Sequence, residues 1–380
     1  MDIFETLEKY EARSMHGQLP VVWSKAKNDI VWDINGKQYI DFTSGVGVAC
    51  AGHNNPRVMA AIWSSDLYFS YTYPTEIRAK YLEELCTYTG FDKAFLVSAG
   101  TQAAESACRL MRLYGMKTGR KTILSIKGST HGKTALSQRL KHEDYDWTCI
   151  NDGIKELKDE NSITKDVCGV IIETYEGWSA KFHDKTFIQN VVEICKERDI
   201  VVCFDEIQAG FGRTGTFFGY QHYDIPRPDL VCVGKGITSG VPCAGVLGRR
   251  DILDLPEPGS MTSSHSANPL ACAAGLANLH EIRRILPFIK YKSDELFTFL
   301  TSKFGKKYTV NVKGMVAGII TPTTEFASAV AVEAMNQGLL VIKTDRPSIK
   351  IMPPLTIEMG NLDIGLSILE KCIVTVEEKR

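Results

Sequence analysis

The sequence has almost no net charge, no long apolar run and no closely paired cysteines. Its 380 residues include 44 Lys and Arg against 45 Asp and Glu, for a net charge of −1. This balance offers no electrostatic basis for binding nucleic acid or an anionic membrane. No stretch approaches the length of a membrane span. The start, MDIFETLEKYEARS, is charged from its second residue and lacks the apolar core of a signal peptide.

The eleven cysteines are scattered and form no CxxC pair, which is typical of free or buried thiols in a reducing compartment. We therefore expect a soluble, cytoplasmic protein with no nucleic-acid or membrane partner, and we predict no metal site. Internal repeats, low-complexity runs and long linkers are also missing. The length is enough for one large domain and a smaller one.

Short apolar segments alternate with helical ones from about residue 55 to 275. The predicted strands are 94–98, 122–126, 168–173, 200–204 and 229–234, and the predicted helices are 101–115 and 187–199. This alternation favours an α/β fold with a doubly wound, mainly parallel sheet. Before it, 30–34 and 39–42 flank Asn35-Gly36, a hairpin turn signal.

After residue 276 the pattern changes to longer helices with strands near 315–321 and 339–343. We predict an N-terminal arm and part of a small domain over 1–54, a large domain over 55–275, and the rest of a small α+β domain over 276–380.

Two apolar runs end abruptly in charged residues, IVVCFD at Asp205 and DLVCVGKG at Lys235. Alone, Asp205 could cap a following helix and Lys235 could extend to solvent. Together they bring a carboxylate and an amine to the carboxyl edge of one sheet, where α/β proteins bind ligands. This pair suits a cofactor with a basic pyridine nitrogen and an aldehyde, pyridoxal 5'-phosphate (PLP). The small residues Gly234, Gly236 and Gly240 leave room for its ring.

Further motifs resemble a known family over nearly the whole chain. They are DIVWDINGKQYIDFTSGVGVACAGHNNPRV, SAGTQAAES, STHGKT, DEIQAGFGRTG, GKGITSGVP, SANPLACAAG and IKIMPPLTI. In this order they are similar to the class III, fold-type I PLP-dependent aminotransferases, in layout nearest to the acetylornithine and ornithine enzymes. The resemblance implies PLP as cofactor, a large PLP-binding domain with a smaller domain built from both termini, and a homodimer with shared active sites.

The resemblance also implies roles for individual residues. Lys235 would bond covalently to the cofactor aldehyde, and Asp205 would pair with the protonated pyridine nitrogen. Ser264 matches a family threonine that reaches the phosphate in the neighbouring subunit. The remaining cofactor contacts would be Gly100 and Thr101 to the phosphate, Gln208 to the phenolic oxygen, Glu173 beside the cofactor and Thr130 on the ring face. Gly100 and Thr101 start a predicted helix, whose N–H groups suit a phosphate, although plain N-capping by Ser98 or Thr101 is the alternative.

Four positions depart from the family pattern. Thr130 stands where an aromatic ring usually stacks on the cofactor, and Trp178 replaces a glutamate that holds a carboxylate-binding arginine. The two positions that usually bind substrate carboxylates with arginine carry Lys133 and Lys350. Lysine cannot make the two-pronged contact that arginine makes with a carboxylate. We therefore expect an altered substrate pocket containing Lys133, Lys350 and Trp178.

The function expected is transamination, from an amino acid or ω-amine donor to a keto acid or aldehyde acceptor. Two alternatives stay open: an aminomutase or racemase of the same fold, and a non-catalytic binding protein that keeps the fold. Gly210–Gly215 matches GxGxxG literally, but it does not open a predicted helix and no acidic residue follows about twenty residues on. We do not expect it to bind a dinucleotide.

Overall fold

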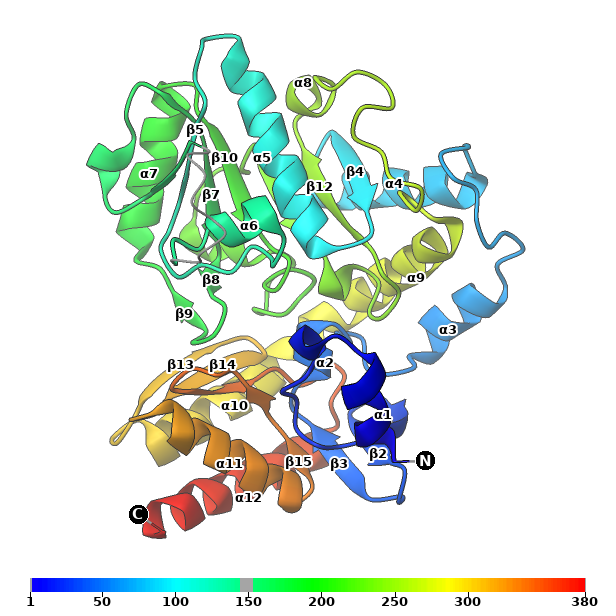
Figure 1. Cartoon of the computed structure of the whole chain (residues 1–380), viewed down its shortest axis with the longest axis vertical. Helices are drawn as coiled ribbons and strands as arrows, with labels where there is room; N and C mark the ends of the chain where they lie inside the picture. Colours follow the sequence, from blue (N-terminus) through cyan, green and yellow to red (C-terminus); the bar gives the residue numbers. More distant parts are fainter. Residues whose placement is uncertain (1, 144–152, 380) are drawn as a thin grey trace.

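The computed structural model describes residues 2–143 and 153–379. Figure 1 shows two stacked halves, an upper one around a large sheet and a lower one that contains segments from both ends of the chain. The large sheet has seven strands, in the order β4 (Lys93–Val97), β12 (Ala244–Gly248), β11 (Leu230–Val233), β10 (Val201–Asp205), β7 (Val167–Glu173), β5 (Thr122–Ser125) and β6 (Ile154–Glu156).

The sheet is mainly parallel, as predicted, and the five predicted strands all lie in it. β10 is parallel to β7 and β11, and β5 is parallel to β7 and β6. β12 runs antiparallel to both of its neighbours, β11 and β4. The sequence patterns did not indicate β12 or β6.

Helices cover both faces of this sheet. Every residue of β7 is buried, and successive side chains enter opposite layers. Ile171 packs in one apolar cluster with Ala107 of α5 (Gly100–Met116), while Ile172 packs in another with Val191 of α7 (Lys185–Glu197). This two-sided burial explains why the strands read as continuous apolar runs. The doubly wound arrangement is confirmed.

Segments from the two ends of the chain pair in the lower half. The predicted hairpin is confirmed as β2 (Ile30–Asp33) and β3 (Gln38–Asp41), with Gly36 in the turn at φ +82°. β1 (Trp23–Lys27) extends it on one side, and β15 (Leu339–Leu340) pairs parallel to β3 on the other. A second, antiparallel sheet contains only C-terminal segments: β13 (Thr309–Lys313), β14 (Val316–Ile320), β17 (Ser348–Ile351) and β16 (Ile342–Lys343).

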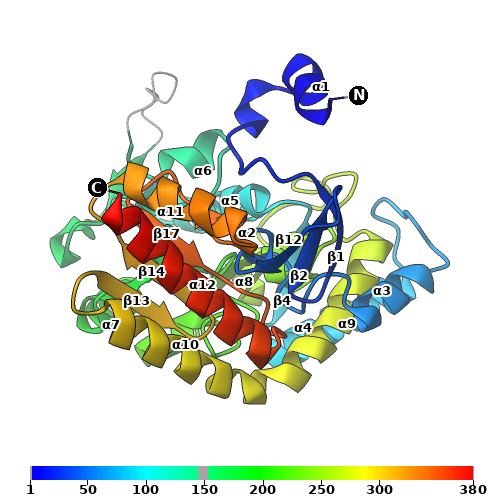
Figure 2. The same cartoon turned by 90° about the horizontal axis from the view of Figure 1, so that it is seen from below.

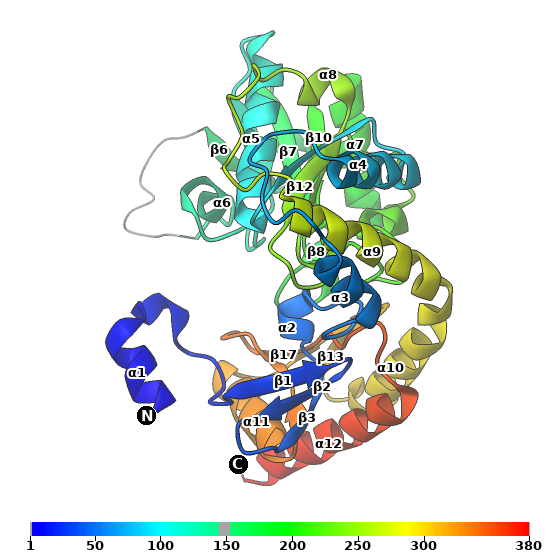
Figure 3. The same ribbon diagram turned by 90° about the vertical axis from the view of Figure 1, so that its right-hand side faces the viewer.

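Two consecutive helices link the halves. Figure 3 shows α9 (Pro269–Ile285) and α10 (Ile289–Phe304) following the edge of the molecule from the large sheet to the C-terminal region. Figure 2 shows α11 (Thr324–Asn336) and α12 (Met359–Glu378) lying over the C-terminal sheet. α9 continues through residues 275 and 276, where the sequence analysis predicts a domain boundary. The division into domains stays a prediction.

The other α-helices and strands complete the two halves. They are α1 (Ile3–Tyr10), α2 (Ser44–Gly47), α3 (Pro56–Trp63), α4 (Glu76–Thr89), α6 (Ala135–Arg139), α8 (Arg250–Leu253), β8 (Tyr175–Glu176) and β9 (Lys181–Phe182). In the described part of the chain, no helix combines the length and apolarity that a bilayer span requires. The ten cysteines located there are all free thiols.

Candidate active site

Three neighbouring strands end in one row of the large sheet. Asp205, the last residue of β10, pairs in register with Glu173 of β7 on one side and Cys232 of β11 on the other. Lys235 follows three residues after Cys232, in a short 3₁₀ turn over Lys235–Ile237. Its backbone has φ +45°, a left-handed conformation that non-glycine residues rarely adopt outside functional sites and tight turns. The strand ends therefore bring Asp205, Glu173 and Lys235 to one edge.

A buried histidine holds the Asp205 carboxylate. Asp205 is 3 % exposed, and its Oδ2 lies 2.7 Å from Nδ1 of His131. Its Oδ1 accepts a hydrogen bond from the Ile207 N–H at 3.0 Å. The other ring nitrogen of His131, Nε2, is buried and has no hydrogen-bond partner among the described residues. Asp205 thus has a fixed orientation, and His131 is a positioning residue that the sequence analysis did not single out.

The charged groups at this edge shift one another's pKa values. Burial lowers the pKa of Lys235 from its usual value, and the negative charges of Glu173 and Asp205 partly oppose that shift. Burial raises the pKa of Glu173 to about 7, against the opposing effect of His131. The Glu173 Oε2 accepts a hydrogen bond from the Thr130 N–H at 2.9 Å. Glu173 and the exposed Thr130 are therefore tied together beside Lys235.

The start of α5 is a second polar element of the site. No side chain caps this helix at Ala99, and the Gln102 side chain accepts instead from the N–H groups of Ser98 and Ala99. The first N–H groups of a helix have no intrahelical acceptor, so Gly100 and Thr101 can present theirs to an anion. A Cβ on Gly132 would lie 2.4 Å from Thr101 Oγ1, so the His131-containing loop packs directly on this helix end.

Lys350 reaches this edge from the C-terminal sheet. It lies on β17, is 2 % exposed, and donates a hydrogen bond to Oε1 of Gln208. Its amine sits 5.4 Å from the centre of the Tyr175 ring. Burial and the positive charge of Lys235 lower the pKa of Lys350 to about 7, although Glu173 opposes the shift. Lys350 is thus a buried amine with partners of its own.

Trp178 lies beside the same strand. It is half-buried, and its carbonyl oxygen accepts a hydrogen bond from the Ser348 hydroxyl at 3.0 Å. Trp178 and Lys350, two of the four altered positions, therefore lie on segments that are joined by a hydrogen bond.

Lys133 and Ser264 are not joined to the others within one chain. Both are exposed, and neither makes a hydrogen bond or ion pair with another predicted site residue in the described ranges. Across residues 2–143 and 153–379, no group of three or more His, Cys, Asp or Glu side chains could hold a metal ion.

Two further buried residues, Glu206 and Arg213, form hydrogen bonds to the backbone of segments near the site. Glu206 accepts hydrogen bonds from the N–H groups of Gly219 and Tyr220, both at 2.7 Å, and burial raises its pKa to about 7. Arg213 donates to the carbonyl oxygens of Met315 at 2.8 Å and Pro353 at 2.5 Å. The glycine-rich segment that matches GxGxxG therefore joins the large sheet to the C-terminal region. The only sequence signal for Glu206 and Arg213 is that each is a charged residue in a largely apolar or glycine-rich segment.

Comparisons with known proteins cover nearly the whole chain. The sequence pattern of the family Aminotransferase class-III matches residues 11–143 and 135–373. An acetylornithine aminotransferase of Methanocaldococcus jannaschii is 31% identical over 401 residues, covering 98% of each chain. The 5-aminovalerate aminotransferase DavT of Pseudomonas aeruginosa is 29% identical over 405 residues, covering 94% of each.

The fold has solved counterparts as well. The crystal structure of ornithine aminotransferase from Toxoplasma gondii matches with a TM-score of 0.92 at 23% identity, covering 99% of this chain and 95% of that one. This likeness identifies the fold as that of fold-type I aminotransferases. With the family pattern matching both parts of the chain, the protein belongs to the class III aminotransferases.

Proposed function

We propose that this class III aminotransferase transfers an amino group at the edge formed by Asp205, Glu173 and Lys235, with PLP, the cofactor of its family. The observation that carries the proposal is the pairing of two strand ends: Lys235, with a lowered pKa, beside an Asp205 carboxylate fixed by His131. A scaffold protein needs neither an amine with a lowered pKa nor a buried carboxylate, because withdrawing either charge from water costs free energy.

The residues present fit PLP in three respects. The uncapped start of α5, with Gly100 and Thr101, suits its phosphate. Asp205 suits a protonated pyridine nitrogen, and Lys235 suits its aldehyde. The exposed Thr130 can cover the ring with its methyl group, without the stacking that an aromatic residue would add.

The side chains would divide the chemistry among them. Bound PLP supplies an aldehyde that takes up an amino group and a ring that withdraws electrons from the neighbouring carbon. Asp205 would keep the ring nitrogen protonated, and His131 would keep Asp205 in place. The Lys235 amine, once released, would carry the proton between the substrate carbon and the cofactor carbon. Its lowered pKa favours the neutral form of the amine, which is the form that can accept a proton.

The substrate side supports a pocket different from that of a carboxylate-binding aminotransferase. Lys350 already bonds to Gln208, lies near the Tyr175 ring and is buried. We infer that Lys350 shapes the pocket and does not anchor a substrate carboxylate. Gln208 would then have to share its amide between Lys350 and the phenolic oxygen of the cofactor. Lys133, which is exposed, stays available as a point charge for an incoming acid.

A homodimer is part of the proposal. Ser264 is exposed on the loop before α9, and by the family resemblance its hydroxyl would contact the phosphate bound by a second copy. The neighbouring His265 contacts the Phe69 ring at 5.5 Å between ring centres. Phe69 belongs to a group of exposed large apolar residues, Trp63, Leu67, Tyr68, Phe69, Tyr71 and Tyr73. Apolar groups of this kind commonly mark protein interfaces.

A half-reaction screen tests the proposed function. The PLP-loaded protein is mixed with one amine at a time, without an acceptor, while the visible absorbance of lysine-bound cofactor is followed. A donor should remove that absorbance and yield a stoichiometric carbonyl product, with the amino group left on the cofactor. An amine that returns only as its enantiomer or positional isomer, with no carbonyl product from any donor, would indicate a racemase or aminomutase and contradict the proposal.

A further inference from the structure

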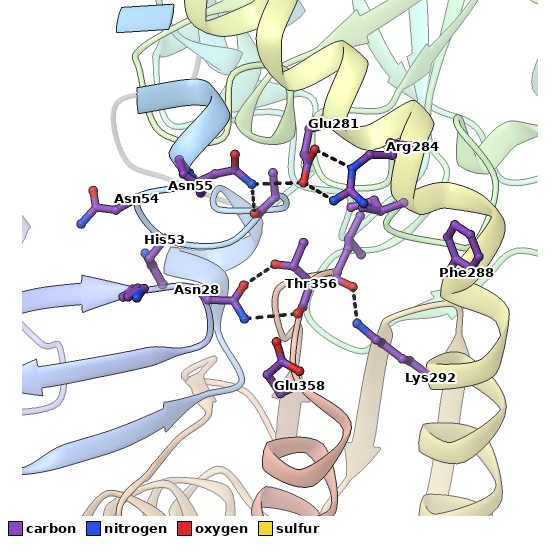
Figure 4. A pocket seen from close by; sticks show the side chains of 15 residues that line it. Asn28, His53, Asn54, Asn55, Glu281, Arg284, Phe288, Lys292, Thr356 and Glu358 are labelled. Carbon is purple, nitrogen blue, oxygen red and sulfur yellow. Dashed lines mark hydrogen bonds and ion pairs between the residues drawn. The ribbon is translucent and has the colours of Figure 1, made fainter. Parts of the chain in front are cut away.

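A second cleft lies apart from the strand-end site. It encloses about 620 Å³, within the range of small-molecule sites. Four segments distant in sequence line it: the end of β1 with Asn28, residues 51–56, the stretch from Glu281 to Lys292, and residues 355–358. Figure 4 shows their side chains turned toward a common space. None of the predicted cofactor or substrate residues lines this cleft.

The floor of the cleft is fixed by reciprocal hydrogen bonds. Thr356 Oγ1 donates to Asn28 Oδ1 at 2.6 Å, and Asn28 Nδ2 donates to the Thr356 carbonyl at 3.2 Å (Figure 4). Gly52 passes close behind this pair, since a Cβ there would lie 2.5 Å from Asn28 Oδ1 and 2.6 Å from Thr356 Oγ1. These contacts hold three segments distant in sequence together at the floor of the cleft.

The acid in the upper wall is already neutralised. Glu281 is 3 % exposed, and Arg284 donates two hydrogen bonds to its carboxylate, at 3.0 and 2.7 Å. Arg57 adds an ion pair at 3.3 Å. Because two guanidinium groups face one carboxylate, this wall does not repel an incoming anion.

Two lysines that line the cleft have N–H donors that are not used in hydrogen bonds to the described part of the chain. Lys292, half-buried on α10, donates one hydrogen bond to the Leu355 carbonyl at 3.1 Å (Figure 4), so two of its three protons are left for a ligand. The Lys27 amine has no hydrogen-bond or ion-pair partner among the described residues. Lys27, Lys292 and Arg284 outnumber the two acids that line the cleft, Glu281 and Glu358.

An apolar side completes the cleft. Ile285 and Leu355 are buried in its wall, and the Phe288 ring stands at the cleft with 71% of its surface exposed. A site with amines on one side and an aromatic ring on the other matches a molecule that is anionic at one end and apolar at the other.

We propose that this cleft binds a small organic anion, with its carboxylate or phosphate on Lys292 and Lys27 and its apolar part against Phe288. The ligand would join the N-terminal segment to α9 and α10, the helices that link the two halves of the molecule. Anion binding in this cleft does not depend on the reaction proposed at Lys235.

Calorimetric titration of the PLP-saturated protein tests the proposal with three probes: phenylacetate, phenyl phosphate and the neutral 2-phenylethanol. We expect saturable binding of at least one anion, weaker binding at high salt, and no binding of the alcohol. Binding of phenylacetate alone or phenyl phosphate alone identifies the preferred anionic group. Lys292→Met should weaken anion binding at least tenfold.

Lys290→Met is the matched control, because Lys290 lies on the same helix, is exposed and pairs with Asp294 at 2.5 Å, outside the cleft. It should bind the anions as the unaltered protein does. Lys27→Met, at an exposed position, gives a second test should Lys292→Met fail to fold, and it should also weaken binding. No binding of either anion overturns the proposal, as does equal binding by the cleft variants and Lys290→Met, which would place the probes at another site.

Discussion

Replacing the buried Lys350 by methionine should change how protein stability depends on pH. The folded protein lowers the pKa of Lys350 from 10.5 to about 7, mainly because the amine is buried. Between these values the unfolded chain binds a proton that the folded chain does not, so the free energy of unfolding rises with pH. The difference of about 3.5 pKa units corresponds to at most about 5 kcal/mol, at 1.36 kcal/mol per unit.

Above about pH 7 the two buried glutamates contribute little to the pH dependence of stability. The raised pKa values of Glu173 and Glu206, both about 7, act in the opposite direction, since the folded protein then holds protons that the unfolded chain has lost. Their contribution is lost as pH rises from about 4.5 to about 7, and above that it stays constant. Lys235 and Lys292 also have lowered pKa values, but both proteins keep these lysines, so the comparison with Lys350→Met reports on Lys350. From about pH 7 to about pH 9, the stability of the unaltered protein relative to Lys350→Met should therefore rise by about 2 to 3 kcal/mol.

Urea unfolding at the two pH values, at one protein concentration, measures this difference. Lys371→Met is the control, because Lys371 is exposed on α12 and its variant should show no such pH dependence relative to the unaltered protein. Lys350→Arg should be destabilised at both pH values, because a guanidinium keeps its charge when buried. A difference between Lys350→Met and the unaltered protein that does not vary with pH would mean that folding does not lower the pKa of Lys350. Tenfold better use of 2-oxoglutarate by Lys350→Arg would show instead that this position binds carboxylates.

Three further outcomes are expected. Asp205→Asn should lower kcat by 10²- to 10³-fold, roughly 3 to 4 kcal/mol, with little loss of PLP affinity; collapse of affinity at an unchanged rate would make Asp205 structural. His131→Asn should lower kcat about tenfold or more and shift its pH profile, while a fall in stability alone would leave His131 without a positioning role. Mixing Lys235→Ala with Ser264→Glu subunits should restore activity if each site takes residues from both chains, and a fully active monomer would exclude sharing.

The charged residues at the strand ends were predictable from the sequence. A strand that is buried on both faces consists of consecutive apolar residues, so its end is easy to locate. Val201–Asp205 and Leu230–Val233 are such runs. Asp205 ends the first and Lys235 comes two residues after the second, so both charges lie at the sheet edge. Ala244–Gly248 escaped prediction because two of its five residues are glycine, which weakens the strand pattern. A Cβ on Gly248 would lie 2.4 Å from Leu230 Cδ2, so close strand packing requires glycine there.

The partners of the site residues were not predictable from local sequence. His131 lies 74 residues from Asp205, and Gln208 lies 142 residues from Lys350. Such pairs form only when the fold brings distant loops together, and no spacing rule records them. The second cleft is an extreme case, since its floor pairs Asn28 with Thr356 across 328 residues.

Chemical trapping of the cofactor shows which lysine forms the covalent bond to PLP. At the strand-end site, Lys235 and Lys350 both have lowered pKa values, and an aldehyde could react with either amine. Borohydride reduction of the PLP-loaded protein, followed by proteolysis and mass spectrometry of the peptides, identifies the lysine that carries the cofactor. The account predicts a single modified residue, Lys235, and no modification in a Lys235→Ala variant treated in the same way. Cofactor attached to Lys350, or to no lysine, would contradict it.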